Sequence, residues 1–222
     1  MKSKNSEFYN VKITKGIDGF NLKARIKNYF YLSTRQISLL SLLLAFEMVV
    51  VLISKFTLGF WIIGGAYTIE LAFFPIIFIA LIFNWFYTSI IAVISVWFRT
   101  LLGSEPIGLI SLTIADLSFL IVFCCLFYTF KKMFNLLLSN NQILKYSFWI
   151  FISGVIASVV SSLISLVCNY LFIFNLYNMP PTQWILWLGV LITNIKYLLN
   201  IAVCCYLFKV LSKILKSFNI SA

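Results

Sequence analysis

Six hydrophobic runs, separated by short polar stretches, constrain the fold of this chain more than any other feature. They cover residues 37–54, 71–83, 86–102, 109–130, 147–174 and 184–208. A helix needs about 20 mostly apolar residues, with a range of about 17–25, to cross a bilayer. The first, third, fourth and sixth runs fit this range, and the fifth is long enough to tilt or to project from the bilayer. The second run is short unless Ile69 and Glu70 begin it. We therefore predict an all-α membrane protein with six transmembrane helices.

The composition agrees with a chain embedded in lipid. Hydrophobic residues make up 62% of the 222 residues and charged residues 10%, whereas soluble domains are about 45–50% apolar and about 25% charged. A soluble enzyme fold and a nucleic-acid-binding protein are therefore excluded. The chain has no histidine, no G-x-x-x-x-G-K-[ST] loop and no C-x-x-C pair among its five cysteines, which argues against His-dependent catalysis, ATP hydrolysis and most metal sites. We expect no catalytic residue, no metal and no cofactor.

The basic residues orient the predicted spans. Lys and Arg favour cytoplasmic loops close to the spans. With the N-terminus inside, the cytoplasmic segments 1–36, 131–146 and 209–222 hold 14 of the 17 basic residues. We therefore expect cytoplasmic N- and C-termini, a basic N-terminal segment (1–36), a six-helix substrate-binding domain (37–208) and a basic tail (209–222). The net charge of +11 is then a topology signal, and nucleic acid is not needed to explain it.

Asp116 is the most informative single residue. It lies about seven residues, or about 10 Å at helical rise, below the outer end of its predicted span. A carboxylate at that depth is costly unless it faces a partner or a water-filled cavity. One interpretation is a structural acid, ion-paired with Arg99 or Lys196 or protonated and hydrogen-bonded. The other is an anchor for a cationic or amine-bearing ligand that enters from outside.

Further polar and aromatic residues collect at the outer ends of the spans, in the stretch 57–70 and around the end of the fifth span. Amides, Tyr hydroxyls and an acid in an aromatic-lined outer cavity suit a flat, polar heterocycle. The predicted ligand-binding residues are Asp116, Tyr170, Asn175, Trp61, Tyr67, Glu70 and Asn178.

The first span carries two more features. Glu47 lies halfway along it, too deep to reach the interface, so we expect a polar partner inside the bundle or in another subunit. Ser38, Ser41 and Ala45 form a pattern of small residues, which lets another membrane helix approach closely.

These features resemble the S component, the substrate-binding membrane subunit, of energy-coupling factor (ECF) vitamin transporters. The resemblance covers about residues 35–205 and rests on a basic N-terminus leading into Ser41-Leu-Leu-Leu-Ala45, six spans in little over 200 residues and no motor motif. Within that family, GGAYTIELAFFPIIFIAL (64–81), a later acid in the fourth span and FISGVI (151–156) look like the thiamine-binding branch. Tyr170 and Asn175 keep that branch's spacing, whereas Ile150 and Ser158 replace its His and Trp.

The resemblance implies that the chain does no covalent chemistry. Its ligand would be thiamine or a related small heterocyclic vitamin, bound in an outward-facing pocket under residues 57–70 acting as a lid. Ser38, Ser41 and Ala45 would dock on the transmembrane T component, which two ATPase subunits drive. The loaded protein would then reorient within the bilayer of the cell membrane.

Three alternatives remain open. The same fold could bind another vitamin, such as riboflavin or folate. The chain could be a purely structural membrane subunit. It could also be an intramembrane lipid enzyme, because Asp18-Gly19 followed by Ala24-Arg25 superficially resembles an alcohol phosphatidyltransferase signature, although the spacing is wrong and no later pair of aspartates follows.

Overall fold

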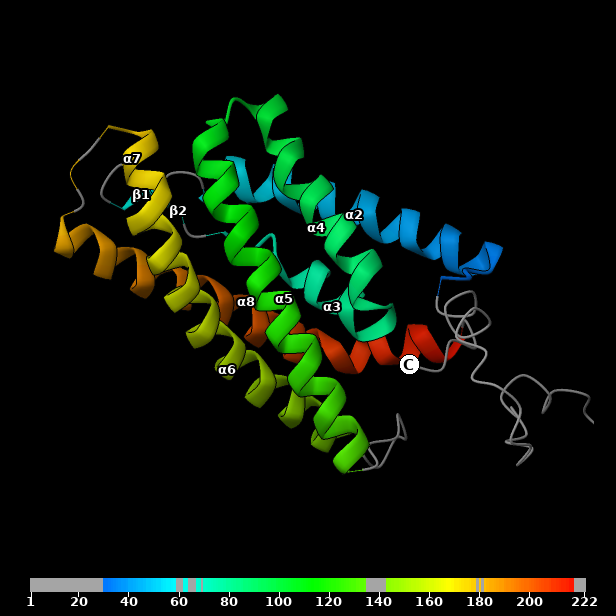
Figure 1. Ribbon diagram of the computed structural model, residues 1–222. Coiled ribbons are helices and arrows are strands. Elements are labelled where there is room, and N and C mark those ends of the chain that lie inside the picture. The colour runs from blue at the N-terminus through cyan, green and yellow to red at the C-terminus, as the bar shows by residue number, and fades with distance from the viewer. Residues whose placement is uncertain are drawn as a thin grey trace, which may run out of the picture. The chain divides into compact units, whose positions relative to one another are not determined.

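Each of the six apolar runs forms a helix in the computed structural model (Figure 1). The structure describes residues 30–58, 62–63, 67–68, 70–134, 143–178, 180 and 182–217. The chain divides into two units, Met1–Ser33 and Thr34–Ala222, and the features below belong to the second. Its long helices are α2 (Thr34–Leu58), α4 (Trp85–Phe98), α5 (Pro106–Met133), α6 (Ile143–Cys168) and α8 (Gln183–Ser217).

Shorter elements connect the long helices. The strands β1 (Ile62–Ile63) and β2 (Tyr67–Thr68) pair antiparallel, with Ile62 opposite Thr68 and Ile63 opposite Tyr67. They are followed by a short helix, α3 (Phe74–Ile82). The 3-10 turn η1 (Arg99–Leu102) ends α4, and the π-helical turn η3 (Asn169–Ile173) and α7 (Phe174–Leu176) extend α6.

The described residues include five helical stretches long and apolar enough to cross a membrane. They are Thr34–Phe56, Trp85–Leu102, Pro106–Met133, Lys145–Leu176 and Gln183–Phe208. The chain is therefore a helical, multi-pass membrane protein. The second predicted span is not among them, because α3 has nine residues and a helix of that length rises only about 14 Å, less than half of the roughly 30 Å hydrocarbon core.

Helix α3 is a buried core helix. Pro75 lies in its first turn, where the missing N–H is tolerated, and Phe83 ends it by adopting an extended backbone conformation. Six of its side chains are buried: Pro75, Ile76, Ile77, Phe78, Ile79 and Leu81. Because α3 packs against α2, α4, α5 and α8, its apolar surface faces protein on nearly every side.

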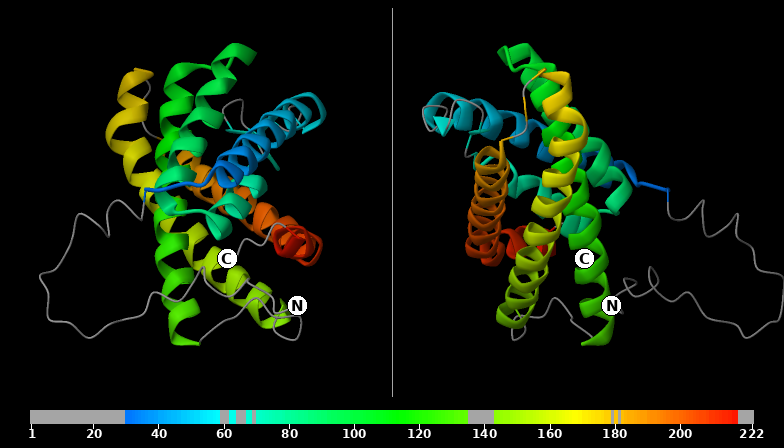
Figure 2. Two further views of the ribbon diagram at one scale, coloured as in Figure 1. Left: turned by 90° about the vertical axis from the view of Figure 1, so that its right-hand side faces the viewer. Right: turned by 60° about the vertical axis from the view of Figure 1, so that its left-hand side comes forward.

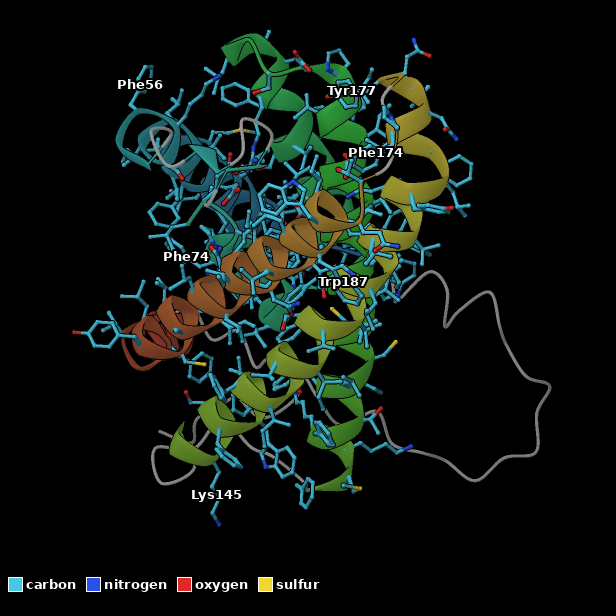
Figure 3. All side chains as sticks on the ribbon, turned by 90° about the vertical axis from the view of Figure 1, so that its left-hand side faces the viewer. Phe56, Phe74, Lys145, Phe174, Tyr177 and Trp187 are labelled. Atoms are coloured by element: carbon cyan, nitrogen blue, oxygen red, sulfur yellow. The ribbon has the colours of Figure 1, made fainter. Side chains whose placement is uncertain are left out.

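Close packing joins the three longest helices. Helix α6 contacts both α5 and α8, and α5 and α6 run alongside each other (Figures 1 and 2). At Gly154 of α6 the contact is so tight that an added Cβ would lie 2.6 Å from Cδ1 of Ile201 in α8. Lys145 and Tyr177 lie at opposite ends of this part of the molecule (Figure 3). Helix α8 continues to Ser217, into the predicted basic tail.

Candidate functional site

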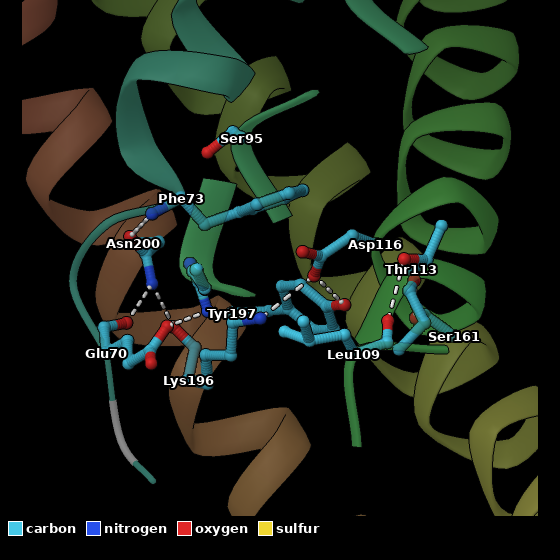
Figure 4. A network of polar contacts seen from close by, with 12 residues as sticks. Glu70, Phe73, Ser95, Leu109, Thr113, Asp116, Ser161, Lys196, Tyr197 and Asn200 are labelled. Carbon is cyan, nitrogen blue, oxygen red and sulfur yellow. Dashed lines mark hydrogen bonds and ion pairs between the residues drawn. The ribbon is translucent and has the colours of Figure 1, made fainter. Parts of the chain in front are cut away.

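Asp116 forms a buried ion pair with Lys196. The Lys196 Nζ lies 2.9 Å from Oδ1 of Asp116, and the Tyr197 hydroxyl donates a 2.7 Å hydrogen bond to the same oxygen. All three side chains are buried, with 1%, 5% and 0% of Asp116, Lys196 and Tyr197 exposed. Figure 4 shows them pointing toward one another from α5 and α8. Of the two partners that the sequence offered for Asp116, Arg99 and Lys196, the structure pairs it with Lys196, which neutralises the carboxylate.

Aromatic rings enclose this ion pair. The Lys196 Nζ lies 5.1 Å from the ring centre of Tyr197 and 5.4 Å from that of Phe73. Phe119 stacks on Tyr197 at 4.4 Å between ring centres. Because rings of this kind exclude water while attracting a cation over their faces, the pair lies in a low-dielectric environment that strengthens its attraction.

Asn200 ties the segment before α3 to helix α8. Its Oδ1 accepts a 2.9 Å hydrogen bond from the backbone N–H of Phe73. Its Nδ2 donates to the carbonyl oxygens of Glu70, at 2.8 Å, and of Lys196, at 2.7 Å. One fully buried amide therefore satisfies three backbone groups and links residues 70–73 to the turn of α8 that carries Lys196.

Replacing Asn200 should weaken this link. Asn200→Ala leaves the buried N–H of Phe73 without an acceptor, so we expect the free energy of unfolding to fall by about 1–3 kcal/mol. Chemical unfolding in detergent measures this loss. Asn194→Ala is the matched control, because Asn194 lies on the same helix and donates only to Ser162 Oγ and the Val190 carbonyl. Equal losses in both variants would contradict the role of Asn200.

A second ion pair joins Glu70 to Arg99. The Arg99 guanidinium contacts the Glu70 carboxylate, and Arg99 is buried at the start of η1. Lys55, near the end of α2, donates to the carbonyl of Leu102 at the other end of η1. These contacts hold the segment between α2 and α3 against the end of α4. Glu70, predicted at the outer mouth of a span, is therefore connected through Asn200 to the turn of Lys196.

The predicted site residues after α6 lie elsewhere on the surface. Tyr170 is 52% exposed. Asn175 is exposed and donates to the Leu171 carbonyl of its own helix. Asn178 is exposed and adopts a left-handed backbone, with φ of 52°. The structure therefore does not bring these three side chains to the buried Asp116. Trp61 lies outside the described residues, as does the side chain of Tyr67, whose backbone belongs to β2.

Two polar contacts lie at this end of the extended α6. Asn169, one residue before Tyr170, is buried and accepts a 2.6 Å hydrogen bond from Ser111 of α5. The Tyr177 hydroxyl donates a 3.0 Å hydrogen bond to Glu105. Partial burial and the adjoining Glu105 carboxylate raise the pKa of Tyr177, so this phenol stays protonated.

The small residues of α2 form an uncovered face. Ser38, Ser41 and Ala45 are all exposed, and the Ser41 hydroxyl donates to the Ile37 carbonyl within the helix. The opposite face of α2 is buried through Leu43, Glu47, Val51 and Ser54. The chain thus leaves the small-residue face of its first described helix open to its surroundings.

The residues that contact Asp116 and Glu70 were the hardest to predict from the sequence. Lys196 was recognised as one possible partner, but Tyr197 and Asn200 were missed. The sequence offers one indication of them, namely that Lys196 and Asn200 lie one helical turn apart inside an apolar run.

Comparison with protein-family models, with curated proteins and with solved structures finds no match.

Proposed function

We propose that this chain is the S component of an ECF-type transporter, which binds thiamine or a related small heterocyclic vitamin. The observation that carries the proposal is the buried cluster of Asp116, Lys196 and Tyr197, linked by Asn200 to the segment between α2 and α3. Charged side chains inside membrane-spanning segments are rare, and they commonly mark substrate or ion pathways. An enclosed cluster next to a long connecting segment is what a binding site with a lid requires.

The cluster favours a ligand with both donor and acceptor groups. Lys196 balances the charge of Asp116, so a simple cation would have to compete with an ammonium group already in place. A neutral ring that bears both donor and acceptor groups, such as the aminopyrimidine ring of thiamine, can instead accept from Lys196 and donate to Asp116, while Tyr197 and Phe119 offer flat aromatic surfaces. The segment 57–70 would open to admit the ligand and close over it.

The proposal includes the assembly and the topology. The exposed face of Ser38, Ser41 and Ala45 would contact the transmembrane T component, which two ATPase subunits drive. Both termini would lie in the cytoplasm if the chain crosses the cell membrane six times. Because α3 alone is too short, the second of these crossings would need residues 70–73 together with α3. The basic segments at the two ends favour this orientation.

Native mass spectrometry of the detergent-purified full chain tests the proposal. We expect a co-purifying ligand to appear as a discrete mass shift, equal to the mass of thiamine or a relative. A shift matching riboflavin, folate or another vitamin would keep the class of protein and correct the ligand. The control is the same chain after unfolding and refolding without vitamins, which should lose the shift and regain it on incubation with the correct compound.

A structural membrane subunit is the second candidate. It is favoured by one observation, namely that Asp116 and Lys196 already satisfy each other within the chain. No mass shift, even after incubation with a mixture of vitamins, would support this second function and overturn the first.

A further inference from the structure

Among the described residues, Glu47 is the buried acid that forms no ion pair with a basic side chain. Apart from the exposed Glu105, the acidic side chains among the described residues are Glu47, Glu70 and Asp116, and each has a polar contact with another element. The buried basic residues among the described ones are Arg99 and Lys196. Arg99 pairs with Glu70 and Lys196 pairs with Asp116. Two basic side chains thus pair with two of the three acids, and one carboxyl group has no basic partner.

The contacts of Glu47 identify it as that group. It is 0% exposed, and its Oε1 accepts a 2.7 Å hydrogen bond from the Ser95 hydroxyl of α4. Its Oε2 has no hydrogen-bond partner among the described residues. The sequence led us to expect a polar partner inside the bundle or in another subunit, and the structure places Ser95 of the bundle in that position. A hydroxyl, however, does not neutralise a carboxylate.

Among the described residues, Arg99 is the basic group whose charge acts on Glu47, and its guanidinium is already in contact with Glu70; the other charged groups that act on Glu47 are the acids Asp116 and Glu70. Helix α2 packs against α3 and α4, and α3 contains no titratable side chain. Tyr87 of α4 and Arg99 beyond its end are the titratable groups on that side, and Arg99 is directed to Glu70. On α2 itself Lys55 lies two turns away and donates to the Leu102 carbonyl.

We propose that Glu47 is a proton-binding site in the membrane interior, and that the folded protein carries one proton on this carboxyl group. A neutral carboxylic acid with one unpaired O–H is far less costly inside a bilayer than a carboxylate without a counter-ion. Release of the proton would leave a charge between α2 and α4, the two helices that Glu47 and Ser95 join. The ligand of this site is the proton, and its occupancy governs how firmly α2 packs.

Infrared spectroscopy of the purified full chain tests the protonation directly. Near neutral pH, the spectrum should contain the C=O stretching band of a protonated carboxylic acid. Carbon-13 labelling of glutamic acid should shift that band, and Glu47→Gln should remove it. Ser95→Ala should move the band without abolishing it, because the hydroxyl donates to the same carboxyl group. A wild-type spectrum without such a band would overturn the proposal, whether or not the variants fold.

The pH dependence of unfolding is the second measurement. Above about pH 4.3 an unfolded Glu has lost its proton, whereas folded Glu47 retains it, so stability must fall as pH rises. Relative to Glu47→Gln, the unfolding equilibrium constant of the wild type should rise about tenfold per pH unit, the slope for one proton. Parallel profiles for the two proteins would overturn the proposal. Stabilisation by Na⁺ or K⁺ at constant pH, absent from Glu47→Gln, would assign the site to a metal cation instead.

Discussion

Asp116→Asn is expected to lower the free energy of unfolding by about 3–5 kcal/mol, the usual effect of removing one partner from a buried ion pair. The substitution keeps the shape of the side chain but leaves the Lys196 ammonium buried, with 5% of the residue exposed and no counter-charge. The Tyr197 hydroxyl would still find an acceptor in the amide oxygen. The loss therefore reports the uncompensated charge. Reversible unfolding in detergent measures it.

A double-mutant cycle separates the ion pair from its surroundings. Lys196→Met on its own should also destabilise, because it leaves the Asp116 carboxylate without its cation. The two substitutions together should restore most of the stability, since replacing both partners of a buried pair is often neutral or favourable. Glu105→Gln is the matched control, because Glu105 interacts with the partly exposed Tyr177 and should lose only about 0.5–1.5 kcal/mol.

The same double variant distinguishes folding from binding. If Asp116 and Lys196 contact the vitamin, the variant should be folded and stable but should bind the ligand found by mass spectrometry more weakly, by about 1.5–3 kcal/mol for each lost charge-assisted hydrogen bond. Unchanged affinity in a well-folded double variant would remove both residues from the binding site.

If the proposed assembly with a T component forms, Ala45→Leu is expected to weaken that docking by about 5- to 150-fold, because overpacking a close contact costs about 1–3 kcal/mol. Ala45 is exposed on α2 with Ser38 and Ser41, on the face opposite the buried Glu47. A leucine side chain there would hold the partner helix away. Vitamin binding to the isolated chain should not change, since the substitution touches none of the buried contacts. Co-purification with the T component and uptake by whole cells measure the effect.

Ala202→Leu is the matched control for this prediction. Ala202 is also exposed and helical but lies on α8, so the same added volume falls on a different face. We expect uptake to survive in Ala202→Leu and to be lost in Ala45→Leu. Equal uptake in both variants would show that the face of Ser38, Ser41 and Ala45 is not the docking surface.

Much of the fold was predictable because hydropathy is a local property. Each membrane-spanning helix satisfies its own backbone hydrogen bonds in lipid, so a long apolar run identifies it without reference to the rest of the chain. The first run and the third to sixth runs were confirmed as helices of spanning length. The second run was marked as short by its length alone, and α3 is indeed a short helix. The burial of α3 on nearly every side was not predictable, because it depends on helices far along the chain.

The contacts of the candidate site could not be predicted from local sequence patterns. The depth of Asp116 indicated a partner, yet Arg99 and Lys196 were equally plausible, and the partner that the structure selects lies 80 residues away. Tyr170 and Asn175 were grouped with Asp116 because of their spacing and polarity. The π-helical turn Asn169–Ile173 changes the direction of the side chains that follow it. No pattern in the sequence predicts this turn.

Membrane insertion and the approximate limits of the long helices follow from the order of apolar and charged residues, because lipid acts on each helix separately. The pairing of Glu70 with Arg99, of Asp116 with Lys196 and of Glu47 with Ser95 depends instead on which helices become neighbours. Inside a low-dielectric bundle a displacement of a few ångströms separates a satisfied ion pair from a buried charge. Such differences arise only when distant segments pack together, so they belong to the tertiary structure.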